Sequence, residues 1–242
     1  MNSTSDLGLK ALNHMKVIRC VGNDELSEMP LKVCKKGRGI CMLNIIHGKE
    51  SAVIVLHEIY GLNPHIKWIC EQYLVAGFDV LCPNFVKSSD YFAYSREEEA
   101  YQYFVKHIGF PLMAHEVKTI LMKARTDYKH VFLLGFSVGA TAAWICSETE
   151  KAVDGVICYY GSRIRDYQNI TPKCPILLIL AKEEKSFNVS ELTSALGQKQ
   201  FVSVHVINGK HGFSDPFSKH YNEQSQQRAQ NLVDKFLIKL KY

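Results

Sequence analysis

Gly135-Phe136-Ser137-Val138-Gly139 is the stretch of sequence that decides the fold. The six residues before it, 129–134, are mostly apolar and predict a buried strand, while residues 140–146 are typical of a helix. Ser137 therefore occupies a turn from strand to helix, where two glycines allow a sharp turn and close packing. Such a turn exposes the serine hydroxyl beside the free N–H groups at the helix start. We expect Ser137 to be a nucleophile.

Strands and helices alternate along the rest of the chain. A helix expected at 64–76 joins strands expected at 51–57 and 78–82, and such a unit favours a parallel sheet. The sequence predicts an α/β fold, with a mostly parallel central sheet and helices on both faces, in a single domain over residues 1–242. Residues 1–14 are expected to form a loose N-terminus. Further strands are expected at 15–21, 40–46, 153–159, 175–180 and 201–207, and further helices at 97–106, 111–126, 190–196 and 222–240.

Turn residues predict two details of the sheet. Gly48 and Lys49 indicate a turn between the strands at 40–46 and 51–57, which we expect to pair as a hairpin at the sheet edge. Pro83 is expected to end the strand before it. The glycines at 37 and 39 begin like a dinucleotide-binding loop, but the third glycine is missing and a strand follows instead of a helix. That kind of site is excluded.

The composition is that of an ordinary folded protein, with 47% hydrophobic and 22% charged residues in 242. Its net charge of +5 comes from scattered lysines, which indicates a solvated surface and no nucleic-acid partner. Neither a signal-peptide core nor 18 consecutive apolar residues occur, so we expect no membrane contact and a cytoplasmic location. The eight cysteines contain no C-x-x-C pair and are expected to be free thiols in a reducing compartment.

A serine nucleophile needs a general base and an acid that orients the base. Loops after two later strands offer both. His211 lies in a glycine-flanked loop after one strand, and Glu183 and Glu184 follow the strand before it. The order Ser137, acid, His211 is the one that the α/β-hydrolase fold requires. We favour Glu184 over Glu183 as the acid, and we expect His205, which lies inside a strand, to be structural.

One group of polar residues resembles half of a metal site. His57, Glu58 and His65 lie close in sequence, but the pattern His-Glu-x-x-Gly lacks the second histidine of a metalloprotease helix. We therefore expect no metal centre. His57 is compatible with a structural or a functional role. Glu58 follows a central strand at its carboxyl end, where open α/β sheets bind ligands, so we expect it to act in the site.

Together these residues resemble the dienelactone hydrolase family of α/β-hydrolases. The resemblance extends over about residues 40–240. Its His-Glu-Ile-Tyr-Gly segment is more specific than the serine turn, because most α/β-hydrolases lack a glutamate there. The matching segments are Leu56-His57-Glu58-Ile59-Tyr60-Gly61-Leu62-Asn63, Leu81-Cys82-Pro83-Asn84, residues 135–139, Tyr159-Tyr160-Gly161 and His211-Gly212-Phe213.

The resemblance implies a cofactor-free hydrolase with a triad of Ser137, Glu184 and His211. The expected reaction is attack of the serine on an ester or lactone carbonyl, formation of an acyl-enzyme and hydrolysis by water. The resemblance also implies that Glu58 points into the site near the nucleophile.

The resemblance further implies an oxyanion hole made by the backbone N–H groups of Ile59 and Val138. The family's name-giving enzymes use a cysteine nucleophile activated through the glutamate, whereas Ser137 relies on His211. This leaves open how His211 and Glu58 divide the work.

Two other positions depart from the family pattern. The family acid is usually an aspartate after a glycine, whereas Ala181 and Glu184 stand here. Enzymes that act on dienelactone hold its carboxylate with two arginines, at positions that correspond here to residues near Lys87-Ser88 and to Asp215. A negative charge at Asp215 disfavours an anionic substrate such as dienelactone.

We expect the protein to bind a small carboxylic ester or lactone as its substrate and to cleave it. The aromatic stretch from Phe85 to Tyr94, together with Tyr160, is expected to shape an apolar pocket for compact substrates. Two alternatives stay open. One is a peptidase or thioesterase on the same fold, and the other is a catalytically silent binding module. The sequence makes no prediction of the oligomeric state.

Overall fold

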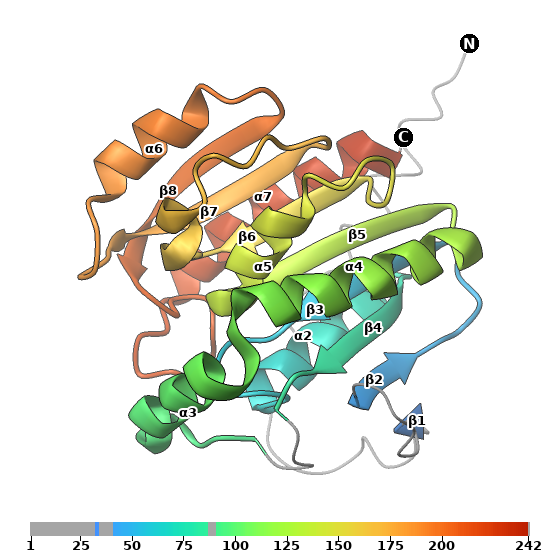
Figure 1. Cartoon of the computed structure of the whole chain (residues 1–242), viewed down its shortest axis with the longest axis horizontal. Coiled ribbons are helices and arrows are strands. Elements are labelled where there is room, and N and C mark those ends of the chain that lie inside the picture. The colour runs from blue at the N-terminus through green and yellow to red at the C-terminus, as the bar shows by residue number, and fades with distance from the viewer. Residues whose placement is uncertain (1–31, 34–40, 87–90, 242) are drawn as a thin grey trace.

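The computed structural model describes residues 32–33, 41–86 and 91–241 (Figure 1). The loose N-terminus expected at 1–14, the strand expected at 15–21 and the glycine loop at 37–39 lie outside the described residues. The described part is built on one sheet with the strand order β1-β2-β4-β3-β5-β6-β7-β8. Its strands are β1 (Lys32–Val33), β2 (Cys41–Ile45), β3 (Ser51–Leu56), β4 (Asp79–Asn84), β5 (His130–Phe136), β6 (Gly155–Tyr159), β7 (Ile176–Glu183) and β8 (Val202–Lys210).

Parallel pairing dominates this sheet. Every neighbouring pair from β4-β3 to β7-β8 is parallel, whereas β1-β2 and β2-β4 are antiparallel. Figure 1 shows α4 and α5 in front of the sheet and α2 and α7 behind it. The predicted α/β fold is confirmed. The helices are α2 (Pro64–Val75), α3 (Glu97–Tyr103), α4 (Gly109–Asp127), α5 (Val138–Cys146), α6 (Val189–Gly197) and α7 (Glu223–Lys241), with short turns of 3-10 helix at Tyr94–Arg96 and Ser162–Asp166 and of π-helix at Phe104–Ile108.

Two hydrophobic cores lie on the two faces of the sheet. In β5, Val131 and Leu133 join the core under α4, α5 and α6, whereas Phe132 and Leu134 join the core under α2 and α7. This alternation follows from the period of two in a strand. The last helix contributes an apolar stripe to the second core, which includes Val233 and Leu237.

The predicted hairpin between the second and third strands is wrong. Strand β4 lies between β2 and β3, so that β2 pairs with β4 and not with β3. Burial explains the difference. All six residues of β3 are buried, as expected for a strand with both faces and both edges covered, whereas β2 is partly exposed and lies near the sheet edge.

Pro83 does not end the fourth strand, which continues to Asn84. The pairing of β4 with β3 stops at Leu81, and beyond that point only β2 pairs with β4. A proline lacks a backbone donor, and a sheet tolerates this where one edge of the strand is free. The prediction was wrong because the sequence does not show where a neighbouring strand stops.

The candidate residues follow the carboxyl ends of five parallel strands, which all lie at the same end of the sheet. Glu58 follows β3, Ser137 follows β5 and Tyr160 follows β6. Glu184 follows β7 and His211 follows β8. Because parallel strands end at the same edge, residues scattered over the chain meet there.

The described residues contain no helix that is long and apolar enough to cross a membrane. The cysteines in this part of the chain are free thiols, as predicted, and all but one are buried. They are Cys41, Cys70, Cys82, Cys146, Cys158 and Cys174.

Candidate active site

Ser137 occupies a strained turn between β5 and α5. Its φ is 53° and its ψ is −111°, a conformation that non-glycine residues rarely adopt. Its backbone N–H donates to the carbonyl of Tyr159 at 3.0 Å. A Cβ on Gly135 would lie 2.3 Å from the carbonyl oxygen of Gly139, and one on Gly139 would lie 2.4 Å from that of Leu56. Both glycines are therefore required by close backbone contacts.

A chain of hydrogen bonds joins the serine to an acid. Ser137 Oγ donates to His211 Nε2 at 2.9 Å, and His211 Nδ1 donates to Glu184 Oε1 at 2.8 Å. The side chain of His211 is 36% exposed and that of Glu184 only 5%, so the acid is shielded while the serine–histidine pair meets solvent. Glu183, the alternative acid, is exposed at the end of β7.

The surroundings of His211 favour its protonated form. Burial by itself lowers the pKa of the imidazole, but the hydrogen bond to Glu184 and the charge of Glu184 raise it above its ordinary value, with smaller contributions from Glu58 and Glu97. The Tyr160 ring packs against the imidazole with centroids 4.9 Å apart. This environment suits a histidine that acts as a general base, because it stabilises the protonated imidazole.

Glu58 is buried near this histidine. Burial, followed by the negative charge of Asp215, raises its pKa to about 7, although a hydrogen bond with Tyr160 opposes the shift. Tyr160 itself is fully buried, and its hydroxyl also contacts Ser214 Oγ at 3.1 Å. Tyr160 thus contacts both His211 and Glu58 from a buried position, and its expected part in a substrate pocket stays a prediction.

The segment that leads to Ile59 packs against the start of α5. A Cβ on Gly139 would lie 2.7 Å from the carbonyl oxygen of His57, so the end of β3 touches the first turn of the helix. Val138 is the first residue of that helix and is buried. Its N–H belongs to the unpaired donors of a helix N-terminus.

A model of the dienelactone hydrolase family matches residues 42–240 of this chain. The chain belongs to the dienelactone hydrolase family. The YczH protein of Bacillus subtilis is 38% identical to it over 175 residues, which cover 72% of this chain and 85% of that protein.

Two solved structures have the same fold. The dienelactone hydrolase from Anabaena variabilis has a TM-score of 0.61 at 17% identity, covering 83% of this chain and 93% of its own. The dienelactone hydrolase-like promiscuous phosphotriesterase P91 from metagenomic libraries has a TM-score of 0.65 at 15% identity, covering 81% of this chain and 88% of its own.

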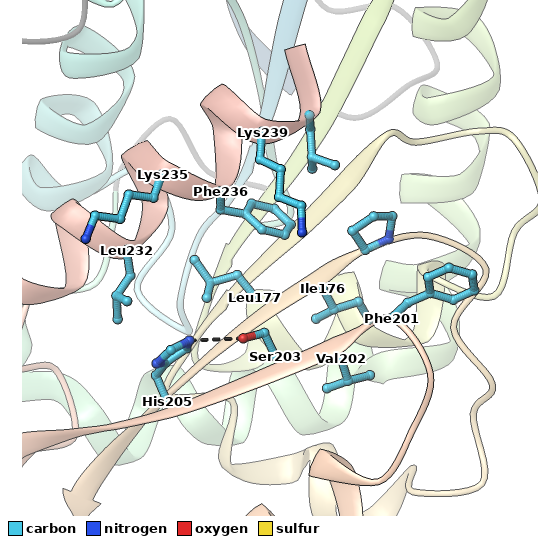
Figure 2. A pocket seen from close by; sticks show the side chains of 12 residues that line it. Ile176, Leu177, Phe201, Val202, Ser203, His205, Leu232, Lys235, Phe236 and Lys239 are labelled. Carbon is cyan, nitrogen blue, oxygen red and sulfur yellow. Dashed lines mark hydrogen bonds between the residues drawn. The ribbon is translucent and has the colours of Figure 1, made fainter. Parts of the chain in front are cut away.

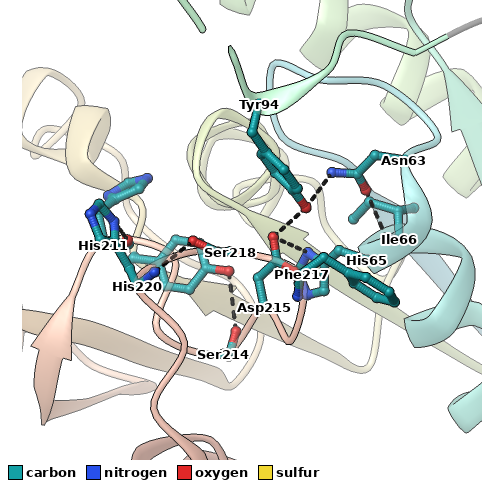
Figure 3. A network of polar contacts seen from close by, with 11 residues as sticks. Asn63, His65, Ile66, Tyr94, His211, Ser214, Asp215, Phe217, Ser218 and His220 are labelled. Carbon is teal, nitrogen blue, oxygen red and sulfur yellow. Dashed lines mark hydrogen bonds and ion pairs between the residues drawn. The ribbon is translucent and has the colours of Figure 1, made fainter. Parts of the chain in front are cut away.

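In this member of the dienelactone hydrolase family, a second polar cluster lies near His211 (Figure 3). Tyr94 donates from its hydroxyl to Asp215 Oδ2 at 2.5 Å and accepts from Asn63 Nδ2 at 3.1 Å. The backbone N–H of Phe217 donates to Asp215 Oδ1 at 2.8 Å. His65 completes the cluster, with Nδ1 3.8 Å from Asp215 Oδ2.

Sequence reasoning missed this cluster as a unit. It noted His65 as part of a half metal site and Asp215 as a substitute for an arginine, but nothing in the local pattern brought the two together. Tyr94 was noted only as one of several aromatic residues. The available signal was the position of Asp215 in the loop that also carries His211.

Two other histidines of this dienelactone hydrolase family member form hydrogen bonds away from Ser137 and Glu184. His57 is buried, and its Nε2 accepts from the backbone N–H of Phe85 at 3.0 Å while its Nδ1 donates to the carbonyl of Glu58. Burial lowers the pKa of His57 to about 4. His205 shares a hydrogen bond of 3.0 Å with Ser203 on the same strand. Phe85 is buried in the core and was expected instead to shape a pocket.

Figure 2 shows a pocket of about 470 Å³ between α7 and the strands β7 and β8. Ile176 and Leu177 begin β7, and Val202 begins β8, so the pocket lies at the amino ends of these strands. The residues that follow the strands lie at the opposite ends, and the pocket therefore does not serve the serine. A second pocket, of about 730 Å³, lies beside Glu184 and is lined by residues of β7, α6 and β8.

Proposed function

We propose that this dienelactone hydrolase family member hydrolyses small carboxylic esters or lactones through a serine acyl-enzyme. The observation that carries the proposal is the hydrogen-bonded chain from Ser137 through His211 to Glu184, with the serine on a strained turn between strand and helix. A serine becomes a strong nucleophile when a base accepts its proton and an acid orients that base. The free thiols in the described residues support action in the cytoplasm.

In the proposed mechanism, His211 Nε2 accepts the proton of Ser137 Oγ as the oxygen attacks the carbonyl carbon. The backbone N–H groups of Ile59 and Val138 receive the developing oxyanion, supported by the packing of β3 against α5. His211 then gives its proton to the leaving alkoxide. Water, deprotonated by His211, releases the acid and regenerates the serine.

The charges around the serine favour neutral substrates. Asp215 stands where enzymes acting on dienelactone have an arginine, and it lies in a buried cluster with Glu58. A carboxylate on the substrate would lack the arginine that holds it in enzymes acting on dienelactone, because Asp215 stands at that position. We therefore propose uncharged esters and lactones rather than dienelactone as substrates.

A fluorophosphonate tests the nucleophile. Ser137 Oγ should displace fluoride, and intact mass should then show a single adduct on the wild-type protein. Ser137→Ala should show none and should lose ester hydrolysis by at least about 10⁴-fold. Ser190→Ala, which removes an exposed serine on α6, is the matched control and should keep both properties.

The absence of an adduct on folded wild-type protein would contradict the proposal and favour a silent binding module or a nucleophile that depends on Glu58. If the adduct forms, a panel of matched esters, thioesters and anilides decides the bond that is cleaved. Esters and lactones should be hydrolysed faster than the other two. A preference for anilides or thioesters would replace the proposal with the peptidase or thioesterase alternative.

A further inference from the structure

Three buried side chains from distant parts of the sequence converge near His211. Glu58, His65 and Asp215 each offer one ligand atom, and these atoms lie within 4.8 Å of one another. They come from the end of β3, the first turn of α2 and the loop between β8 and α7. Their exposed fractions are 5%, 0% and 2%. The cluster therefore combines two carboxylates and an imidazole in an interior position.

His65 lacks the partners that a buried imidazole needs. Neither of its ring nitrogens has a hydrogen-bond partner among the described residues, although the side chain is fully buried. Its Nδ1 faces Asp215 Oδ2 at 3.8 Å, which is too long for a hydrogen bond (Figure 3). The ring is held in place by Phe136, at 4.8 Å between centroids. A buried polar group without a partner is unfavourable, which indicates that a further partner fits here.

The charges of the cluster specify what kind of partner would fit. The cluster consists of two carboxyl groups and one imidazole, and all three side chains are buried. The donors that these acids have are neutral groups. Asp215 accepts from the Tyr94 hydroxyl and the Phe217 N–H, and Glu58 accepts from the Tyr160 hydroxyl. Two buried carboxylates without a cation are unfavourable. A divalent cation would neutralise both.

The spacing also fits a metal ion. Ligand atoms bound to one zinc ion at about 2.0–2.2 Å lie roughly 3.4 Å apart in tetrahedral geometry. The His65 Nδ1 to Asp215 Oδ2 separation of 3.8 Å is close to that value. Imidazole and carboxylate donors suit zinc and its neighbours in the transition series.

The geometry points to a binding site for one divalent transition-metal ion of the zinc class, formed by Glu58, His65 and Asp215. Such an ion would tie the end of β3, the start of α2 and the loop that carries His211 to one another. Its role in this proposal is structural, because the proposed hydrolysis uses Ser137, His211 and Glu184 and needs no metal. The expectation of no metal, drawn from the sequence, rested on His57, Glu58 and His65 without Asp215.

Cobalt(II) and zinc(II) are the probes for this site. Tag-free protein is dialysed against a chelator, and the metal is added to the folded protein and, separately, during refolding from urea. Elemental analysis after desalting should give one ion per chain. The cobalt form should show visible absorption bands of a low-symmetry site, and the Tm should rise with metal concentration.

Three variants assign the ligands. Asp215→Asn and Glu58→Gln keep the shape of each side chain but remove its charge, and His65→Leu removes the ring nitrogens. Each should weaken cobalt binding at least about 100-fold, because even the loss of an outer partner of a metal ligand costs about 10–100-fold. His115→Asn removes an exposed histidine on α4 and should leave binding unchanged.

The proposal is overturned if the folded wild-type protein takes up no stoichiometric metal by either route. It is equally overturned if the three variants bind as tightly as the wild type, since the metal would then lie on surface residues. Circular dichroism of each variant verifies folding before the comparison. If all three variants misfold, the cobalt spectrum of the wild-type protein decides alone, and a spectrum of aqueous cobalt overturns the site. The readouts do not use ester hydrolysis, so the outcome is independent of the proposed function.

Discussion

Ser137 and His211 show how strain and hydrogen bonding act on single residues. The φ of Ser137 lies in the region that favours glycine, and such strain persists only where the surroundings determine the backbone. Here the Tyr159 carbonyl, the tight glycine contacts and the helix start hold the residue in place. The hydroxyl consequently remains aimed at His211 Nε2.

The identity of the acid makes a prediction at the residue scale. Glu184→Gln removes the charge that orients and stabilises protonated His211, so kcat should fall on the order of 10³–10⁴-fold. Glu183→Gln changes the exposed carboxylate next to it, at the end of β7, and should change kcat less than about twofold. Steady-state kinetics on one neutral ester provides the measurement. Equal and mild losses in the two variants would mean that neither glutamate is the acid.

The same pair of variants makes a prediction about pH. The pKa of His211 is raised above 6.5 mainly through Glu184, and only the neutral imidazole can accept the serine proton. Activity of the wild type should therefore rise with pH through a pKa above 6.5. Removing the Glu184 charge lowers that pKa, so the rise in kcat/KM should move to lower pH in Glu184→Gln. The profile of Glu183→Gln should stay where it is, and a shift in that variant instead would contradict the assignment.

The turn from β5 to α5 is fixed by close backbone contacts at its two glycines. Gly135 faces the carbonyl oxygen of Gly139, and Gly139 faces the end of β3. These contacts set the angle between strand and helix, and they bring the segment before Ile59 against the helix start. The geometry of the nucleophile is thus a property of three packed elements.

Gly135→Ala tests this packing. The added Cβ would lie 2.3 Å from a backbone oxygen that cannot move away like a flexible side chain, so the variant should lose at least about 3 kcal/mol of unfolding free energy. For a chain of this length, that corresponds to a fall in Tm of about 6–12 °C. Gly197→Ala at the end of α6 meets no atom within 4 Å and should stay within about 0.5 kcal/mol of the wild type. Differential scanning calorimetry compares the two, and equal Tm values would refute the close contact.

At the scale of the whole molecule, stability depends on two cores separated by the sheet. The core under α2 and α7 contains Val233 and Leu237 of the last helix. This helix is the last element of the described chain, and it packs against β6, β7 and β8. Packing of α7 therefore supports strands that carry the candidate site at their ends.

Leu237→Ala should lower the free energy of unfolding by about 2–5 kcal/mol, because the side chain is 2% exposed and its loss leaves a cavity. Asn231→Ala changes an exposed position of the same helix and should stay within about 0.5 kcal/mol of the wild type. Urea unfolding followed by fluorescence measures both. A cost below about 1 kcal/mol for Leu237→Ala would show that α7 is not an integral part of this core.

The sequence by itself determined the alternation of strands and helices and the turn at Ser137. Both depend on short-range rules, namely the period of apolar residues and the conformational freedom of glycine. It also indicated Glu184 and His211, because the α/β-hydrolase order assigns each partner to a loop after a given strand. These features can be read within a few residues of each position.

Only the tertiary structure decided the features that depend on distant contacts. It inserted β4 between β2 and β3, because burial of both faces of β3 outweighs the local turn at Gly48. It also brought Glu58, His65 and Asp215 together, since three separate elements end at one edge of the sheet. No local pattern encodes the meeting of such residues, because it follows from how the whole sheet is ordered.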